Sequence, residues 1–407
     1  MATPEPVGTL GIPVYKRFAL HPVSVFVGIW ALVLALYRLK LSDLLLYDDA
    51  DTLGPVLTIV GAFIAGCLVA RLMGSKLRKS VGPIVLPMSP ARLAALDLRL
   101  SQMLKFWFVM TLVEIVFSGG VPLYWLYIGS DKTYFDFGLP SLHGLLNALI
   151  LSCSMMSFFL SRYSTRTLYK WVPWLLCVWG IVVVSRNLIV VNLLQIALLH
   201  LLTRPPMKMK NIAMGLLALC LFVLGFGALG DARSGAEAFV ALALPSENYP
   251  DYLPSGVLWL YIYITTPLNN LVHQIVAVGP EWNWGLTNAM SLLLPTVIRN
   301  LFYDAQDFFK GDLISEAFNV STAFLDIYKD IGLLGVASLS FCAGFASLRI
   351  WVTNTVTSIF NFAVITQCNV LSIFFNHYFY LPIVFQFVVI RYFVAERGGR
   401  NVVAQPV

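Results

Sequence analysis

The segment from Gly332 to Ile350 reads GLLGVASLSFCAGFASLRI, and Arg349 is the only charged residue in it. A helix of this length crosses the hydrocarbon core of a bilayer, which is about 30 Å thick. The whole chain has this character, because 58% of its 407 residues are hydrophobic and 12% are charged. Its mean hydropathy is +0.79. This composition predicts an all-α polytopic membrane protein, with a single integral membrane domain over residues 1–407.

Comparable apolar runs recur along the chain and predict about ten transmembrane helices. They lie near 22–39, 53–73, 102–119, 140–161, 171–184, 187–202, 211–229, 332–350, 356–375 and 378–394. A further run, 256–278, is interrupted by Pro267, Asn269 and His273. We expect it to be re-entrant, or paired with the shorter run 288–302, because broken backbone at membrane depth is tolerated where it lines a cavity. Residues 231–330 then form a large external loop region, with re-entrant or amphipathic helices, between the seventh and eighth spans.

Positive charge is concentrated in alternate loops between these runs. The residues concerned are Lys16, Arg17, Arg71, Lys76, Arg78, Lys79, Arg92, Arg99, Arg162, Arg166, Lys170, Arg204, Lys208, Lys210, Arg349, Arg397 and Arg400. The positive-inside rule places these loops and both termini in the cytoplasm, so the net charge of +6 does not imply nucleic-acid binding. The six cysteines lie within apolar runs without a CxxC pair, which predicts neither disulfides nor metal ligands.

Three arginines fall on the predicted outer side, where the positive-inside rule does not account for them. Arg186 lies between two apolar runs, Arg233 follows the run 211–229, and Arg299 follows the run 288–298. Guanidinium groups bind phosphate oxygens in pairs, so two or three of them could hold a diphosphate. The alternative is that each one extends to the interface or pairs with a neighbouring carboxylate, as Asp231 could with Arg233.

Glu114 and His143 are the candidate acid–base residues. Glu114 is the only carboxylate within its apolar run, and a buried glutamate can serve as a base. It could equally hydrogen-bond a neighbouring span as a structural group. His143 lies near the outer start of its span, where it could act as a base, a sugar ligand or an ordinary interfacial histidine.

Two further features of the predicted outer loops have a functional and a simpler interpretation. Asp49 and Asp51 are spaced as in some metal-dependent glycosyltransferases, but an acidic outer loop also satisfies the charge rule, and we expect no metal and no cofactor. Aromatic residues are frequent outside, at Trp259, Tyr261, Tyr263, Trp282 and Trp284. Their rings could stack on sugars, although anchoring at lipid headgroups is the more common role.

Several strings resemble the Wzy-type O-antigen polymerases, which are oligosaccharide repeat-unit polymerases. The resemblance runs from Glu114 to the last span. It rests on Glu114 with Gly119-Gly120-Val121-Pro122-Leu123, on Phe137-Gly138-Leu139-Pro140-Ser141-Leu142-His143-Gly144-Leu145-Leu146-Asn147, on Ser185-Arg186, on Gly230-Asp231-Ala232-Arg233, on Tyr261-Ile262-Tyr263 with Pro267-Leu268-Asn269, and on Asn319 and Thr322 before Tyr328-Lys329-Asp330-Ile331-Gly332.

The resemblance implies a GT-C-like glycosyltransferase of the bacterial inner membrane. It would polymerise undecaprenyl-diphosphate-linked oligosaccharides on the outer face, in O-antigen and lipopolysaccharide synthesis. A flippase and a chain-length regulator are the protein partners to expect beside membrane lipids. We predict catalytic roles for Glu114, His143, Arg186 and Arg233, and substrate contacts for Arg299, Asn269, His273, Tyr328 and Asp330. The alternatives are a translocator of lipid-linked oligosaccharide, which the absence of two similar halves argues against, and an O-antigen ligase.

Overall fold

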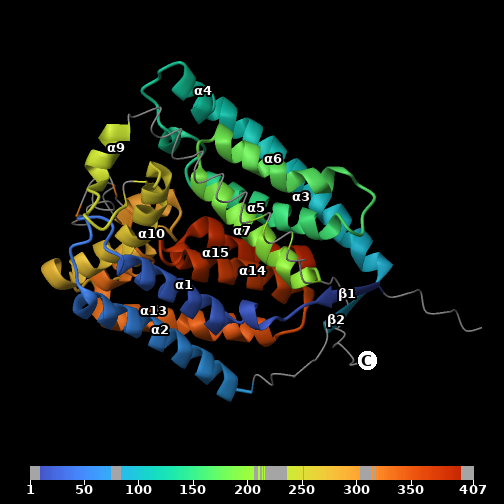
Figure 1. Ribbon diagram of the computed structural model, residues 1–407. Coiled ribbons are helices and arrows are strands. Elements are labelled where there is room, and N and C mark those ends of the chain that lie inside the picture. The colour runs from blue at the N-terminus through green and yellow to red at the C-terminus, as the bar shows by residue number, and fades with distance from the viewer. Residues whose placement is uncertain are drawn as a thin grey trace, which may run out of the picture.

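The computed structural model describes residues 10–74, 84–205, 210, 213, 215, 236–250, 252–302, 313–314, 318 and 320–395. The protein is all-α, with 71% of the described residues in helices (Figure 1). The long helices are α1 (Pro22–Tyr37), α2 (Asp49–Leu72), α3 (Pro90–Ser118), α5 (Leu142–Leu160), α6 (Leu168–Val182), α7 (Arg186–Thr203), α10 (Ser255–His273), α13 (Leu325–Val352), α14 (Val356–Leu371) and α15 (Leu381–Val394). Shorter helices are α4 (Pro122–Tyr127), α9 (Ala236–Ala243), α11 (Thr287–Met290) and α12 (Thr296–Phe302), and single turns lie at Phe18–Leu20, Tyr134–Asp136, Gln274–Val278 and His377–Phe379.

Five helices in the described part of the chain are long and apolar enough to cross a membrane. They are α2, α3 together with α4, α5, α7 and α13, and the apolar helices α1, α6, α14 and α15 are shorter. Each of these nine helices overlaps a run that the sequence predicted as a span. The predicted span 211–229 lies outside the described residues, apart from Ala213 and Gly215. The protein is therefore a helical membrane protein by composition and helix length, and the number of spans stays a prediction.

The closest helix pair is α2 with α13, which run side by side in the same direction along one edge of the bundle (Figure 1). Glycines allow the approach, because a Cβ on Gly66 would lie 2.0 Å from the Phe341 carbonyl oxygen, and one on Gly344 would lie 2.1 Å from that of Phe63. The Ser340 hydroxyl donates to the Ile59 carbonyl at 2.6 Å. Small residues and hydroxyl groups bring helices together in lipid, where the hydrophobic effect does not.

The centre of the bundle is formed by α5, α7, α14 and α15 and is partly polar. Ser154 on α5 donates to the Asn192 side chain on α7 at 2.6 Å, and Gln195 on α7 donates to Gln367 on α14 at 3.3 Å. Because these groups have no contact with lipid, their hydrogen bonds fix how the central helices face each other. Helices α3 and α6 pack outside this centre, next to α5.

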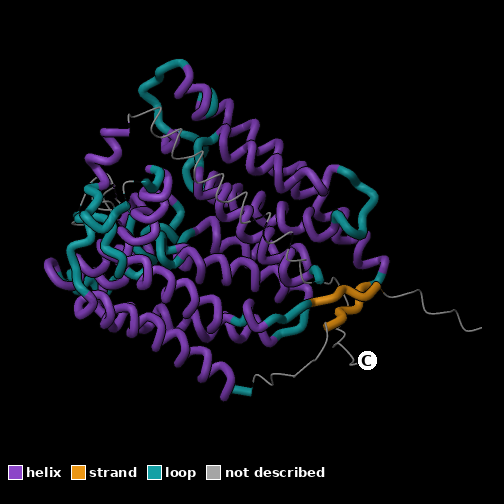
Figure 2. Tube along the Cα trace, in the orientation of Figure 1, coloured by secondary structure: helices purple, strands orange, loops and turns teal. Residues whose placement is uncertain are grey.

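One end of the bundle is held by basic side chains, and we call it the basic end. Arg17 donates to the Arg204 carbonyl, Arg162 to the Thr203 carbonyl, and Arg99 to the carbonyls of Phe393 and Ala395, at 2.6 to 2.8 Å. These carbonyls lie at the C-terminal ends of α7 and α15, where helices have no acceptor partners of their own. Strands β1 (Leu10–Val14) and β2 (Ile84–Met88) pair antiparallel at this end (Figure 2), which the sequence analysis did not predict.

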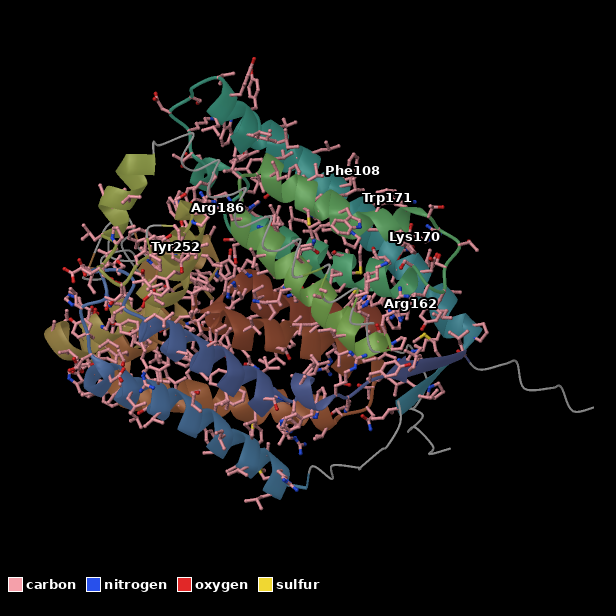
Figure 3. The ribbon with its side chains drawn as sticks, in the orientation of Figure 1. Phe108, Arg162, Lys170, Trp171, Arg186 and Tyr252 are labelled. Atoms are coloured by element: carbon pink, nitrogen blue, oxygen red, sulfur yellow. The ribbon has the colours of Figure 1, made fainter. Side chains whose placement is uncertain are left out.

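The opposite end of the bundle contains the end of α3 and the starts of α5, α7 and α15, and we call it the site end. Figure 3 shows Arg186 and Tyr252 there, far from Arg162 and Lys170 at the basic end. The run 256–278 forms one continuous helix, α10, extended by a π-helical turn at Gln274–Val278. Pro267 lies within this helix, and Asn269 and Asn270 are fully buried. Helix α10 packs against α1, so this part of the predicted external region belongs to the body of the bundle.

Candidate active site

Glu114 and His143, which lie far apart in the sequence, meet at the site end. Glu114 is buried in the last turns of α3, and His143 lies in the first turn of α5. Glu114 Oε2 is 3.2 Å from His143 Nδ1, and Glu114 Oε1 accepts from the Leu139 backbone N–H at 3.1 Å. The structure thus brings two predicted catalytic residues together and gives each carboxylate oxygen a partner.

Asn147 extends this pair by one helical turn. Its side-chain Nδ2 is 3.0 Å from His143 Nε2. An ionised carboxylate only accepts hydrogen bonds, so with Glu114 ionised the His143 proton resides on Nδ1 and Nε2 accepts from Asn147. A histidine whose Nδ1–H is held by a carboxylate carries its lone pair on Nε2, the arrangement of a general base, and here that lone pair accepts from Asn147. Asn147 was not among the predicted site residues, although its i, i+4 spacing from His143 on a helix was a usable signal.

The loop between α3 and α5 shapes this group. Helix α3 ends at Gly119, which has φ 73°, and the Lys132 ammonium donates to the Ser118 carbonyl at 2.8 Å. The Gly138 N–H donates to the Ser118 hydroxyl at 2.9 Å, which folds the loop back onto the end of α3. The Phe137 ring meets the His143 ring edge-to-face at 5.3 Å. The loop therefore contributes a second contact to the imidazole, beside that of Asn147.

Gly138 is required by the close approach of His143. Its φ is +95°, and a Cβ on it would lie 2.7 Å from His143 Cγ. Both observations favour glycine, since other residues are strained at this φ and real Cβ contacts are longer. The glycine in this string therefore has a physical role in placing the imidazole next to Glu114.

Arg186 begins α7 at the same end and is exposed (Figure 3). Among the described residues it has no hydrogen bond or ion pair. It lies close enough to Tyr134, in the loop before α5, to oppose electrostatically the rise in the Tyr134 pKa that burial causes. Asn187, the next residue, holds the start of α7 to the Phe375–Leu381 turn, because its Oδ1 is 3.1 Å from Nε2 of the buried His377. The start of α7 is thus held by Asn187, and the Arg186 side chain next to it is exposed.

Arg299 lies on α12, which is attached to the start of α5. The Val297 N–H donates to the Ser141 hydroxyl at 3.2 Å, two residues before His143. Arg299 is half-buried there. Arg233 lies outside the described residues, so its predicted role is untested by the geometry.

Asn269 and His273 lie in a separate cluster on α10. Asn269 Oδ1 accepts from the Tyr37 hydroxyl at 2.6 Å, and its Nδ2 donates to the Leu44 carbonyl at 2.7 Å. His273 Nδ1 is 2.6 Å from the Tyr47 hydroxyl, whose pKa is raised by burial and then by the nearby Asp51. These bonds hold the loop between α1 and α2 against α10, and no contact joins them to Glu114 or His143 in the described structure.

Tyr328 and Asp330 lie in a third cluster, in the first turns of α13. The Tyr328 hydroxyl is 3.4 Å from the Ile275 carbonyl. Asp330 is buried, and its carboxylate accepts from the backbone N–H groups of Asn288 at 3.2 Å and Ala289 at 2.8 Å. Asp330 therefore fixes the start of α11, and its predicted contact with substrate stays a prediction.

The acidic loop before α2 has local partners. Asp48 accepts from the N–H groups of Ala50 and Asp51 and caps α2, and Asp49 pairs with Arg38 at 3.0 Å. Within the described ranges, no group of three or more histidine, cysteine, aspartate or glutamate side chains is placed to hold a metal ion.

An apolar groove of about 310 Å³ lies between α3 and α6. Trp107 and Phe108 line it from α3, together with Lys105. Trp107 meets Trp179 edge-to-face at 5.8 Å, and Trp179 in turn lies 6.1 Å from Phe137, which contacts His143. A continuous row of aromatic rings thus connects the groove to the site.

No protein-family model, curated protein or solved structure matches this chain.

Proposed function

We propose that the protein is a membrane glycosyltransferase that polymerises undecaprenyl-diphosphate-linked oligosaccharide repeat units on the outer face of the bacterial inner membrane. The observation that carries the proposal is the Glu114–His143–Asn147 group, with its 3.2 Å and 3.0 Å contacts, at the same end as the exposed Arg186. The resemblance in the strings around these residues supports the substrate class.

In the proposed reaction, His143 Nε2 takes the proton of an acceptor sugar hydroxyl. The hydroxyl oxygen bonds to the anomeric carbon of the donor, while the bond from that carbon to the diphosphate oxygen breaks and its electron pair leaves with the diphosphate. Asn147 yields its place on Nε2 to the acceptor and can bind it through its amide. Glu114 stabilises the imidazolium that forms, as a buried carboxylate does for a histidine base.

Arg186 has the second role, which is to stabilise the leaving diphosphate. Charge that develops on the leaving oxygens is stabilised by a donor already in place, and removing such a group typically costs about 10²- to 10³-fold in rate. The apolar groove between α3 and α6 suits the isoprenoid chain of the donor, because its aromatic row leads to His143.

The deciding experiment supplies purified, reconstituted protein with the lipid-linked repeat unit as sole substrate. Longer lipid-linked chains support a polymerase, whereas reaction only after addition of a second acceptor indicates a ligase. Movement of the lipid-linked unit between leaflets without any new bond indicates a translocator. Either of the last two results overturns the proposal.

The His143→Ala variant tests the assigned base in the same assay. We expect the rate to fall about 10²- to 10⁴-fold, because general-base catalysis contributes this much. His200→Ala is the matched control, since His200 lies in the last turn of α7 at the basic end. Thermal unfolding in detergent should be similar for both variants. Chains of normal length from His143→Ala would remove this residue from the mechanism.

A further inference from the structure

Two tryptophans project from the loop between the π turn at Gln274–Val278 and α11. The Trp282 and Trp284 rings lie 6.2 Å apart with their planes 24° from parallel. Their side chains are 57% and 68% exposed, although tryptophan carries one of the largest apolar surfaces among the residues. The loop therefore presents two nearly parallel ring faces away from the core.

Hydrogen bonds to α13 hold this loop in place. The N–H groups of Glu281 and Trp282 both donate to the Lys329 carbonyl, at 2.7 and 3.3 Å, and the Lys329 ammonium pairs with Glu281 Oε1 at 2.9 Å. The Asn288 side chain bonds both Glu281 Oε2 at 3.0 Å and Asp330 Oδ1 at 2.8 Å. The loop backbone that bears the rings is therefore fixed before any ligand arrives, which lowers the entropic cost of binding.

The backbone at Trp282 is strained. Its φ is +58°, a conformation that costs a residue with a side chain on the order of 1 kcal/mol or more. The ring tip reaches the kink of α13, where it would lie 3.4 Å from a Cβ on Gly332, itself at φ +62°. Strain of this kind persists where the surroundings impose it, and it is concentrated at binding and catalytic sites.

We propose that Trp282 and Trp284 form a platform that binds a sugar ring of the oligosaccharide, with Glu281 and Asn283 as hydrogen-bonding neighbours. The apolar face of a sugar ring stacks on an indole, and a ligand site combines such surfaces with a few polar groups. Glu281 is partly exposed next to the two tryptophans and is paired with Lys329. That the sugar belongs to the repeat unit rests on the proposed function.

The segment after the platform leads to the candidate active site. The Leu292 carbonyl accepts from the Leu381 N–H at 3.0 Å, at the start of α15, and Val297 bonds to Ser141. One continuous segment, residues 280–302, thus connects the ring pair to the turn that bears His143. A glycan that extends beyond the reacting sugar would lie along this segment.

Binding of a defined probe tests the platform on the full chain. The probe is the lipid-free oligosaccharide released by mild acid from the lipid-linked repeat unit, followed by saturation-transfer NMR and calorimetry in detergent. We expect Trp282→Ala and Trp284→Ala each to weaken binding about tenfold, which corresponds to about 1.4 kcal/mol. Phenylalanine at either position should restore part of the affinity. Trp174→Ala, on the exposed face of α6, should bind as the wild type does.

Unchanged affinity in both alanine variants that retain the wild-type unfolding temperature would overturn the platform. So would an absence of probe binding to the wild-type protein. Quenching by brominated acyl chains that decreases in Trp282→Phe and in Trp284→Phe, relative to Trp174→Phe, would identify a membrane anchor instead. Probe binding that depends on both rings in a protein that does not polymerise would sustain the platform and refute the proposed function alone.

Discussion

At the scale of single residues, the candidate site depends on how the neighbours of the His143 imidazole hold it in position. His143 contacts the Glu114 carboxylate, the Asn147 amide and the Phe137 ring, and Gly138 lies so close that an added Cβ would meet the imidazole. Bases that are held by several neighbours keep the orientation that proton transfer needs. A small shift of the imidazole should therefore affect the rate more than the stability.

Gly138→Ala provides this shift. The added methyl would meet His143 Cγ at 2.7 Å, so the ring must shift from its position next to Glu114. We expect polymerisation to slow by about 10²-fold, which is typical of a misplacement of about 1 Å. The rate should change through kcat rather than through substrate affinity, which single-turnover and steady-state kinetics separate.

Gly129→Ala is the matched control for this substitution. Gly129 also has a positive φ, of +65°, but no atom lies within 4 Å of its added Cβ. Both variants carry the same type of backbone strain, and only Gly138→Ala disturbs His143. Equal rates in the two variants would refute the positioning role.

Among the helices, the α2–α13 pair is the contact most sensitive to side-chain volume. We expect Gly344→Ala to destabilise the protein by about 1–3 kcal/mol, since its Cβ would overlap the Phe63 carbonyl on a facing helix. Gly61→Ala on α2 is the control, because nothing lies within 4 Å of its Cβ. Thermal unfolding in detergent measures the difference, and equal unfolding temperatures would show that the two helices are not in close contact.

The helices themselves could be predicted from sequence, and the contacts between them could not. Long apolar runs predict helices because lipid leaves backbone groups no other partner, and nine runs contain them. The resemblance led us to predict substrate contacts for Asn269 and Asp330, and this role stays a prediction. Their partners within the protein, Tyr37 and Asn288, lie on other segments, which one sequence does not pair. The pairing of β1 with β2 was missed for the same reason.

For the molecule as a whole, the separation of its two ends makes membrane orientation testable. Tyr252 and Lys170 lie at opposite ends (Figure 3). With native cysteines removed, we expect an impermeant maleimide to label Tyr252→Cys in intact cells and Lys170→Cys only after lysis. The positive-inside rule predicts this pattern, because it places the basic loop that contains Lys170 in the cytoplasm. The reverse pattern would place Arg186 on the cytoplasmic side, where it could not meet an external lipid diphosphate.

The arginines at the basic end have a consequence for how such membrane proteins are re-engineered. The carbonyls at the ends of α7 and α15 accept hydrogen bonds from Arg17, Arg99 and Arg162. The positive charges of the same side chains also determine the orientation in which the protein inserts into the membrane. Replacing these arginines with apolar residues, in order to invert the orientation of the protein in the membrane, would also destabilise the C-terminal ends of α7 and α15. Glutamine at these positions separates the two effects, because it keeps a donor while it removes the charge.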